Sequence, residues 1–175
     1  MIVCFSVIGL LCFTGCTGGE ESVDSNALLS VAVNQLKASS HYTITTEVES
    51  LSTGIRSEKT EEVTVSGDAV TVVTTYKKPN EIGADEAYTT TTEKKTYSKS
   101  DFAGVVFNVD GLSCTIDGNI IEIDLPAKAQ VESVFGLKNV SAAKATIKMK
   151  NNAFEYLTYY YTTSNQNKVT VTVKN

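Results

Sequence analysis

A strict two-residue alternation of side-chain character, repeated along most of the chain from His41 onward, is the strongest constraint on its fold. Within "HYTITTEVESL" one face would carry Tyr42, Ile44, Thr46 and Val48, and the other would carry Thr43, Thr45, Glu47 and Glu49. Successive side chains of a strand point to opposite faces of a sheet, so this pattern gives one buried and one solvated face. Thr, Val and Tyr, which are frequent in this chain, also favour strands. The sequence therefore predicts a mainly β protein.

Turn signals divide the alternating segments into strands. Residues 55–66 and 69–78 are separated by Gly-Asp, and "AAKATIKMK" is separated from "AFEYLTYYYTT" by Asn151-Asn152. Such pairs favour tight hairpins and hence antiparallel neighbours. Asp-Gly pairs at 110–111 and 117–118 extend the same prediction to short antiparallel strands within 102–125. Residues 87–100 are polar on both faces, which is typical of an edge strand or of a hairpin at the edge.

Two segments have a helical rather than a strand period. In 25–39 the apolar residues fall on one helical face, and in 126–136 Pro126 suits the first turn while Gly136 suits the end. The predicted faces consist of Leu28, Leu29, Ala32, Val33 and Leu36 in the first helix and of Ala127, Val131, Val134 and Phe135 in the second. The expected fold class is α+β and mainly β: a curved antiparallel sheet, or half-barrel, packed on an N-terminal and a second helix.

The N-terminal segment has the character of an export signal. Residues 2–13 are an apolar run too short for a permanent membrane helix, and Phe13-Thr14-Gly15-Cys16 follows it. This run resembles the lipobox of bacterial lipoproteins. The resemblance implies that residues 1–15 are a signal peptide, that Cys16 becomes the lipidated N-terminus, and that 16–24 form a tether. The protein would then be lipid-anchored on the extracytoplasmic face of the cell membrane. The alternative is a buried apolar segment with Cys16 as an inert core thiol.

The order of elements in residues 25–175 is similar to that of the lipoprotein carriers of the LolA/LolB type and their LppX/LprG-like relatives. The helix "NALLSVAVNQLKAS" feeds directly into "HYTITTEVES", and the chain closes with three strands joined by an Asn turn and a loop. In that family a curved antiparallel sheet surrounds helices and leaves an apolar concavity for acyl chains. The resemblance implies a single domain of this kind and a non-enzymatic role.

Few residues are candidates for catalysis or for metal binding. His41 is the only histidine, it has no nucleophile motif nearby, and we interpret it as a surface residue. The carboxylates Asp110, Asp117, Glu122 and Asp124 lack a calcium-loop pattern, and no zinc spacing occurs. Loss of Cys4 and Cys12 with the signal would leave Cys114 as a packed core thiol. We therefore expect no enzyme activity, no cofactor and no metal site.

Two functions fit this organisation. The net charge of −5 and pI near 4.9 argue against a nucleic-acid partner. The first function is binding of lipid or acylated ligands between sheet and helices, and the second is an anchored interaction module that contacts an envelope protein or cell-wall polymer without a lipid cavity. Alternation places Leu157, Tyr159 and Tyr161 on one face and Phe154, Tyr156 and Tyr160 on the other. The residues predicted to line a ligand cavity are Ile44, Val48, Val70, Val72, Ile147, Met149, Leu157 and Tyr159.

Overall fold

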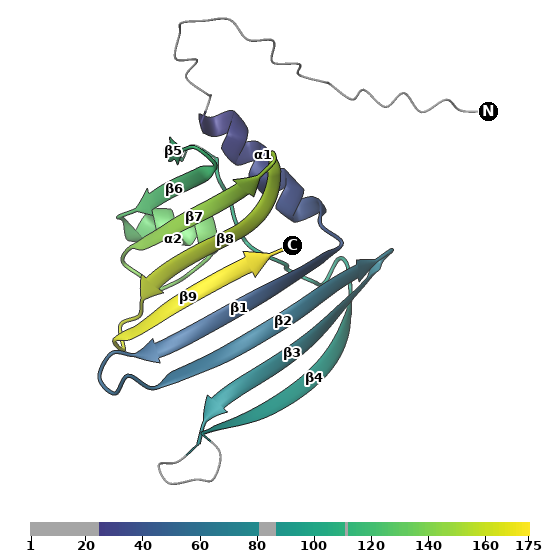
Figure 1. Ribbon diagram of the computed structural model, residues 1–175, viewed down its shortest axis with the longest axis vertical. Helices are drawn as coiled ribbons and strands as arrows, with labels where there is room; N and C mark the ends of the chain where they lie inside the picture. The colour runs from purple at the N-terminus through teal and green to yellow at the C-terminus, as the bar shows by residue number, and fades with distance from the viewer. Residues whose placement is uncertain (1–24, 81–86, 111) are drawn as a thin grey trace, which may run out of the picture.

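The computed structural model describes residues 25–80, 87–110 and 112–175, which form one antiparallel sheet and two helices (Figure 1). Within these residues the sheet has nine strands in the order β4-β3-β2-β1-β9-β8-β7-β6-β5 and is open at both edges. The strands are β1 (His41–Ser50), β2 (Arg56–Ser66), β3 (Ala69–Pro79), β4 (Tyr88–Ser98), β5 (Thr115–Asp117), β6 (Ile120–Leu125), β7 (Ala143–Lys150), β8 (Ala153–Thr162) and β9 (Asn167–Lys174). This mainly β, α+β architecture with a curved sheet confirms the predicted fold class.

The two helices lie on the same face of the sheet, behind it in the view of Figure 1. Helix α1 (Ser25–Ala38) buries Leu29, Ala32, Val33 and Leu36, as its helical period predicts. The side-chain amide of Gln35 joins it to β8, because Phe154 N–H donates to Oε1 at 2.6 Å and Nε2 donates to the Asn152 carbonyl at 3.1 Å. Helix α2 (Lys128–Phe135) contacts β6. We call the face that carries both helices the concave face and the other the convex face.

The concave face holds the core. Ile121, Ile147, Leu157 and Val173 are neighbours in one row across β6, β7, β8 and β9, and each is at most 1% exposed. Each such side chain contributes roughly 1.5–3 kcal/mol through removal of apolar surface from water. The core is therefore concentrated over the half of the sheet that the helices cover.

The convex face explains why threonine is so frequent. One row of directly paired residues crosses seven neighbouring strands, in the order β4, β3, β2, β1, β9, β8 and β7. Every member of this row is threonine. This threonine row consists of Thr92, Thr75, Thr60, Thr45, Thr172, Thr158 and Thr146. Hydroxyls bond across it at Thr75–Thr92 (3.3 Å) and Thr158–Thr172 (3.1 Å). β-branched side chains suit the pleated sheet, and their hydroxyls keep this face wetted.

The predicted face of Phe154 was wrong because β8 is irregular near its start. Lys148 pairs with Tyr156 but Met149 pairs with Phe154, so β8 has one extra residue, Glu155, at a β-bulge. A bulge reverses the parity of the residues before it relative to those after it. Phe154 is therefore buried at 5% exposure, whereas Tyr156 and Tyr160 lie on the convex face. Leu157, Tyr159 and Tyr161 share the concave face, as predicted.

The expectation of short strands throughout 102–125 was half right. The Asp117-Gly118 pair lies at the β5–β6 hairpin, with Gly118 at a φ of 57°. The described residues of 102–114, in contrast, form no strand and run over the core, where Phe107 is buried. Asn108 N–H donates to the Val134 carbonyl of α2 at 2.9 Å instead of to a neighbouring strand. The apolar residues of this segment predict that it is buried. They do not predict that it lies over the core as an irregular segment instead of pairing in the sheet.

Helix α2 begins two residues later than predicted. Ala127 precedes its first turn with an extended φ of −109°, and the Gln130 side chain accepts the Ala127 N–H at 3.1 Å. Pro126 and Ala127 are therefore exposed and outside the helix, whereas Val131, Val134 and Phe135 are buried as predicted. Gly136 ends the helix at a φ of 66°, a left-handed conformation that glycine adopts with little strain.

Candidate functional site

The concave face changes from apolar to polar along two neighbouring rows of paired residues. The row that runs through Leu157, Val173 and Ile44 continues into Glu61, Thr74 and Glu93 of β2, β3 and β4. The next row passes from Tyr159 and Val171 to Thr46, Lys59 and Tyr76. The concave face is therefore apolar over β5 to β9 and β1, whereas the parts of β2 to β4 that these rows reach form a polar wing. Nearer to the end of α1, the concave residues of β2 and β3 are apolar: Val63, Val65, Val70 and Val72.

Ion pairs and hydrogen bonds connect the polar side chains of that wing. Lys59 Nζ lies 2.8 Å from Glu61 Oε2, and the Tyr76 hydroxyl donates to Glu93 Oε1 at 3.3 Å. Lys95 Nζ also lies 3.3 Å from Glu93. An acyl chain laid over this wing would remove these groups from water without replacing their hydration, which is unfavourable. Any apolar ligand must therefore bind closer to the helices.

The eight predicted lining residues all lie on the concave face, but packed side chains fill the space around most of them. Ile147, Met149 and Leu157 are at most 2% exposed, and Val70 and Val72 are also buried. Ile44 and Tyr159 are partly buried against this core, and Val48 is half-buried. A ligand at Ile147 or Leu157 would have to displace core side chains. The cavity along these residues stays a prediction.

Tyr159 shows how tightly this region is packed. Its ring stacks on Phe135 of α2 with centroids 4.1 Å apart, and Phe135 in turn stacks on Phe107 at 5.3 Å. Tyr161 follows Tyr159 at 6.4 Å. Burial, together with the neighbouring Tyr161, raises the pKa of Tyr159 to about 12. The phenol is therefore neutral at physiological pH and acts as a packing residue.

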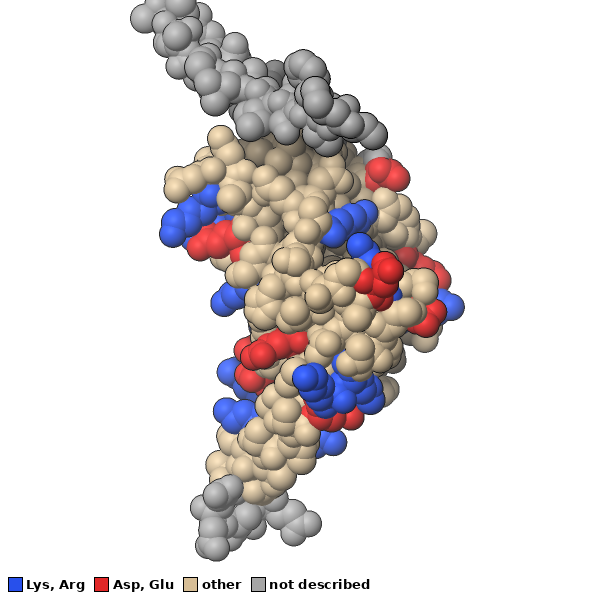
Figure 2. All heavy atoms as spheres, turned by 90° about the vertical axis from the view of Figure 1, so that its right-hand side faces the viewer, with Lys and Arg blue, Asp and Glu red and all other residues tan. Residues whose placement is uncertain are grey.

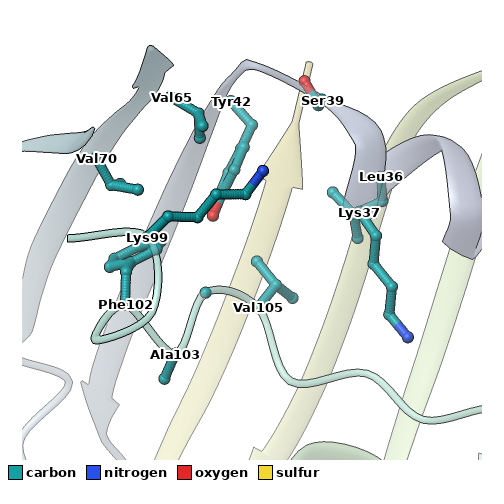
Figure 3. A pocket seen from close by; sticks show the side chains of 11 residues that line it. Leu36, Lys37, Ser39, Tyr42, Val65, Val70, Lys99, Phe102, Ala103 and Val105 are labelled. Atoms are coloured by element: carbon teal, nitrogen blue, oxygen red, sulfur yellow. The ribbon is translucent and has the colours of Figure 1, made fainter. Parts of the chain in front are cut away.

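A pocket of about 320 Å³ opens between the end of α1, strands β1 to β3 and the segment that follows β4 (Figure 3). We call it the α1 pocket. Its apolar lining comes from elements far apart in the sequence and consists of Leu36, Tyr42, Val65, Val70, Phe102 and Val105. Val70 is the residue that it shares with the predicted lining. Its volume lies at the lower end of the range for small-molecule sites, roughly 300–1,000 Å³.

Gly104 lets the segment after β4 approach Tyr42. Its φ is 61°, and a Cβ at this position would lie 3.6 Å from the Tyr42 hydroxyl oxygen. Glycine is the residue that adopts such a left-handed conformation without strain. Burial raises the pKa of Tyr42, and the Glu61 carboxylate adds to the effect. Tyr42 is thus a neutral hydrogen-bonding group in the mostly apolar wall.

Two lysines give the α1 pocket its charge. Figure 3 shows the Lys99 side chain lying across the pocket toward Tyr42 and Ser39, while Lys37 extends from the end of α1. Neither ammonium forms an ion pair with a residue of the described part of the chain. On the side of the molecule shown in Figure 2, positive and negative side chains are interspersed. The pocket therefore combines an apolar wall with two ammonium groups that form no ion pair with another described residue.

Sequence reasoning missed Phe102, Lys99 and Gly104 as part of a pocket. The available signal was the apolar run "FAGVVF" directly after a polar strand, which indicates a segment that returns to the core. The Asp-Gly pairs that follow predict short strands for this region, and a strand gives no reason to place the run against α1. Nothing local in these residues specifies their contact with Tyr42, more than fifty positions earlier in the chain.

The remaining sequence candidates show no catalytic arrangement. His41 is exposed, and its Nδ1 lies 3.1 Å from the Thr64 hydroxyl. Cys114 is half-buried and packs against the core. Asp110, Asp117, Glu122 and Asp124 are exposed, and the described ranges contain no group of His, Cys, Asp and Glu side chains that could hold a metal ion. Cys16, the segment 1–15 and the tether 16–24 lie outside the described residues.

No family model matches the chain, and no curated protein matches its sequence. Among the helices of the described residues, neither is long and apolar enough to cross a membrane. Functional inference therefore depends on the geometry of the chain itself.

Proposed function

We propose that this protein is a membrane-anchored bacterial envelope lipoprotein without enzyme activity, whose domain binds an acylated or otherwise amphiphilic anionic ligand in the α1 pocket. The observation that carries the proposal is the combination of apolar wall and positive charge in that pocket. Hydrocarbon gains free energy from leaving water, and a carboxylate or phosphate gains from a position near Lys99 or Lys37. The anchor expected at Cys16 would hold the domain beside the membrane that supplies such ligands.

The size of the α1 pocket restricts the ligand. About 320 Å³ accommodates one chain of moderate length rather than the several acyl chains of a lipoprotein. The ion-paired side chains of the polar wing, Lys59, Glu61, Glu93 and Lys95, give no apolar extension of the site. We therefore propose a single-chain amphiphile, such as a fatty acid or a lysophospholipid, as the ligand class.

Titration of residues 25–175 with a fluorescent fatty acid tests this function. Val65 is half-buried and lines the pocket, so Val65→Phe should abolish saturable binding by filling it. Val73→Phe is the matched control, because Val73 is a half-buried residue of the convex face of β3. Lys99→Gln should weaken binding of the fatty acid by about tenfold and leave its uncharged alcohol unaffected. Equal binding by wild type and Val65→Phe would refute the pocket assignment.

The alternative function, an anchored module that contacts an envelope protein or cell-wall polymer, has an observation in its favour. Leu51 and Ile55 flank the tip of the β1–β2 hairpin and are 55% and 51% exposed. Exposed apolar residues at a loop tip are suited to contact with a partner. A photo-crosslinking amino acid at position 51 in cells would capture that partner, and one at the exposed Val106 would serve as control. Absence of a position-specific product would argue against this function.

A further inference from the structure

A second pocket opens at the rim of the sheet, where β6 and β8 end and β7 begins. Its volume is about 590 Å³, and it shares no lining residue with the α1 pocket. We call it the rim pocket. The side chains with polar atoms that line it are Asp124, Ser141, Lys144, Tyr160, Tyr161 and Thr162. Concave sites of this size with several convergent polar groups are suited to ligand binding.

The charged groups of the rim pocket neutralise each other. Lys144 Nζ lies 3.2 Å from Asp124 Oδ1, and both side chains are mostly exposed. The hydrogen bond that the Lys144 ammonium donates to Asp124 is the main cause of a raised pKa for Lys144, which keeps the ammonium charged. The pair offers both a strong donor and a strong acceptor but no net charge. An anion would be repelled by Asp124 and a cation by Lys144, whereas a hydroxyl group can donate to one and accept from the other.

An exposed aromatic ring continues this arrangement along the convex face. Asp124, Lys144, Tyr160 and Thr170 are consecutive cross-strand partners on β6, β7, β8 and β9. Adjacent strands are about 4.8 Å apart, so the four side chains span about 14 Å. Tyr160 is 43% exposed, which leaves part of its ring available to a ligand. Acceptor, donor, flat apolar ring and hydroxyl therefore lie in one line.

The threonine row runs directly beside that line. Thr158 and Thr172 belong to it and lie two residues from Tyr160 and Thr170 on the same face of β8 and β9. The row adds hydroxyls without charge. Strands β7 and β8 each pair on both sides, so an extended peptide lying here would find no unpaired backbone to extend the sheet.

We propose that the rim pocket and the adjoining line of Lys144, Tyr160 and Thr170 bind an uncharged glycan chain. A saccharide presents hydroxyls that both donate and accept, together with apolar C–H faces that pack on an aromatic ring. The saccharide hydroxyls match the Asp124–Lys144 ion pair and the protein hydroxyls, and the C–H faces match the Tyr160 ring. The inference does not depend on ligand binding in the α1 pocket. Of the two partners in the alternative function, an envelope protein and a cell-wall polymer, it selects the cell-wall polymer for this surface.

Calorimetric titration of the purified full-length protein in detergent tests the proposal. The probes are chitotetraose, which is neutral, and an oligogalacturonate of the same length, which is anionic. Wild type should bind chitotetraose and not oligogalacturonate. Tyr160→Ala should weaken chitotetraose binding by about tenfold through loss of the ring contact. Tyr88→Ala is the matched control, because Tyr88 is a convex-face tyrosine of similar exposure, 39%, on β4.

A charge variant separates recognition from a structural role. Asp124→Asn leaves Lys144 without its carboxylate partner and should give the protein salt-sensitive affinity for oligogalacturonate. Unchanged circular dichroism would show that the fold is intact in each variant. The proposal is overturned if wild type binds neither sugar, if Tyr88→Ala weakens binding as much as Tyr160→Ala, or if a neutral peptide binds where chitotetraose does not. The pocket-filling Val65→Phe variant should leave chitotetraose binding unchanged, so each site can fail without the other.

Discussion

At the scale of single residues, the buried phenol of Tyr159 links packing to pH dependence. Its ring lies between Phe135 and Tyr161, and burial raises its pKa to about 12 from an ordinary value of 10.0. Below pH 10 the phenol is neutral in both the folded and the unfolded chain, so it contributes no pH dependence there. Above pH 10 the unfolded state loses its proton first, and the folded state becomes relatively less stable.

The free energy of unfolding should therefore decrease between pH 10 and about 12, with Tyr159 accounting for at most about 2–3 kcal/mol. Urea unfolding at a series of pH values, compared between wild type and Tyr159→Phe, isolates this contribution. The difference between the two proteins should be constant below pH 10 and change above it. A difference that stays constant up to pH 12 would show that the phenol is solvated in the folded state.

The exposed fraction of each leucine side chain predicts how much its replacement by alanine lowers the free energy of unfolding. Leu29 of α1 is 1% exposed, whereas Leu51 at the β1–β2 tip is 55% exposed. Leu29→Ala should lower the free energy of unfolding by about 2–5 kcal/mol, because it removes core contacts and leaves a cavity. Leu51→Ala, the same chemical change at the surface, should lower it by less than about 0.5 kcal/mol. Chemical denaturation measures both, and a loss below that limit for Leu29→Ala would mean that α1 is not packed on the sheet.

At the scale of secondary structure elements, β4 is the part of the sheet most exposed to unwanted pairing. It is an edge strand that pairs with β3, and its side chains are exposed except at Glu93, which is half-buried. Long edge strands act as templates for pairing with other chains, and lysines on them oppose this. Lys94 and Lys95 occupy the middle of β4, one on each face. We interpret them as protection of the edge.

Replacing both lysines by threonine should therefore promote self-association through β4. The variant Lys94→Thr/Lys95→Thr should elute as dimers or larger species in size-exclusion chromatography with light scattering, at concentrations where wild type is monomeric. Lys77→Thr/Lys78→Thr on β3 removes the same charge from a strand that is paired on both sides, and it should leave the elution unchanged. Equal behaviour of the two variants would assign any association to net charge instead of to the edge.

The success of sequence reasoning depends on whether an element's pattern is local. The two-residue alternation of β1 and β3 and the helical period of α1 require only neighbouring residues, and the structure confirms these elements. The β8 bulge and the course of 102–114 depend on contacts with distant residues, such as Asn108 with Val134. For this reason the parity of Phe154 and the strands expected before β5 were wrong.

At the scale of the whole molecule, residue patterns predict the sheet but not its division into an apolar and a polar half. Glu61 and Val63 lie on the same face of β2, and only the register with β1 and β3 shows that Val63 is buried while Glu61 pairs with Lys59. The α1 pocket lies at the end of α1, beside the apolar residues of β1, β2 and β3. Its lining comes from α1, β1, β2, β3 and the segment after β4, so no single motif predicts it.

The lipid anchor proposed at Cys16 would determine which membrane-derived ligands the domain can reach. Residues 17–24 would separate Cys16 from Ser25, the first residue of α1, by at most about 32 Å when fully extended. In cells fed an alkyne-labelled fatty acid, wild type should carry the label and sediment with membranes, and Cys16→Ser should lose both properties because the acyl chains supply the anchor. Cys114→Ser removes the other cysteine of the expected mature chain and should keep both. Unlabelled, uncleaved wild-type protein at steady state would refute the anchor, and with it the supply of amphiphiles from the adjacent membrane.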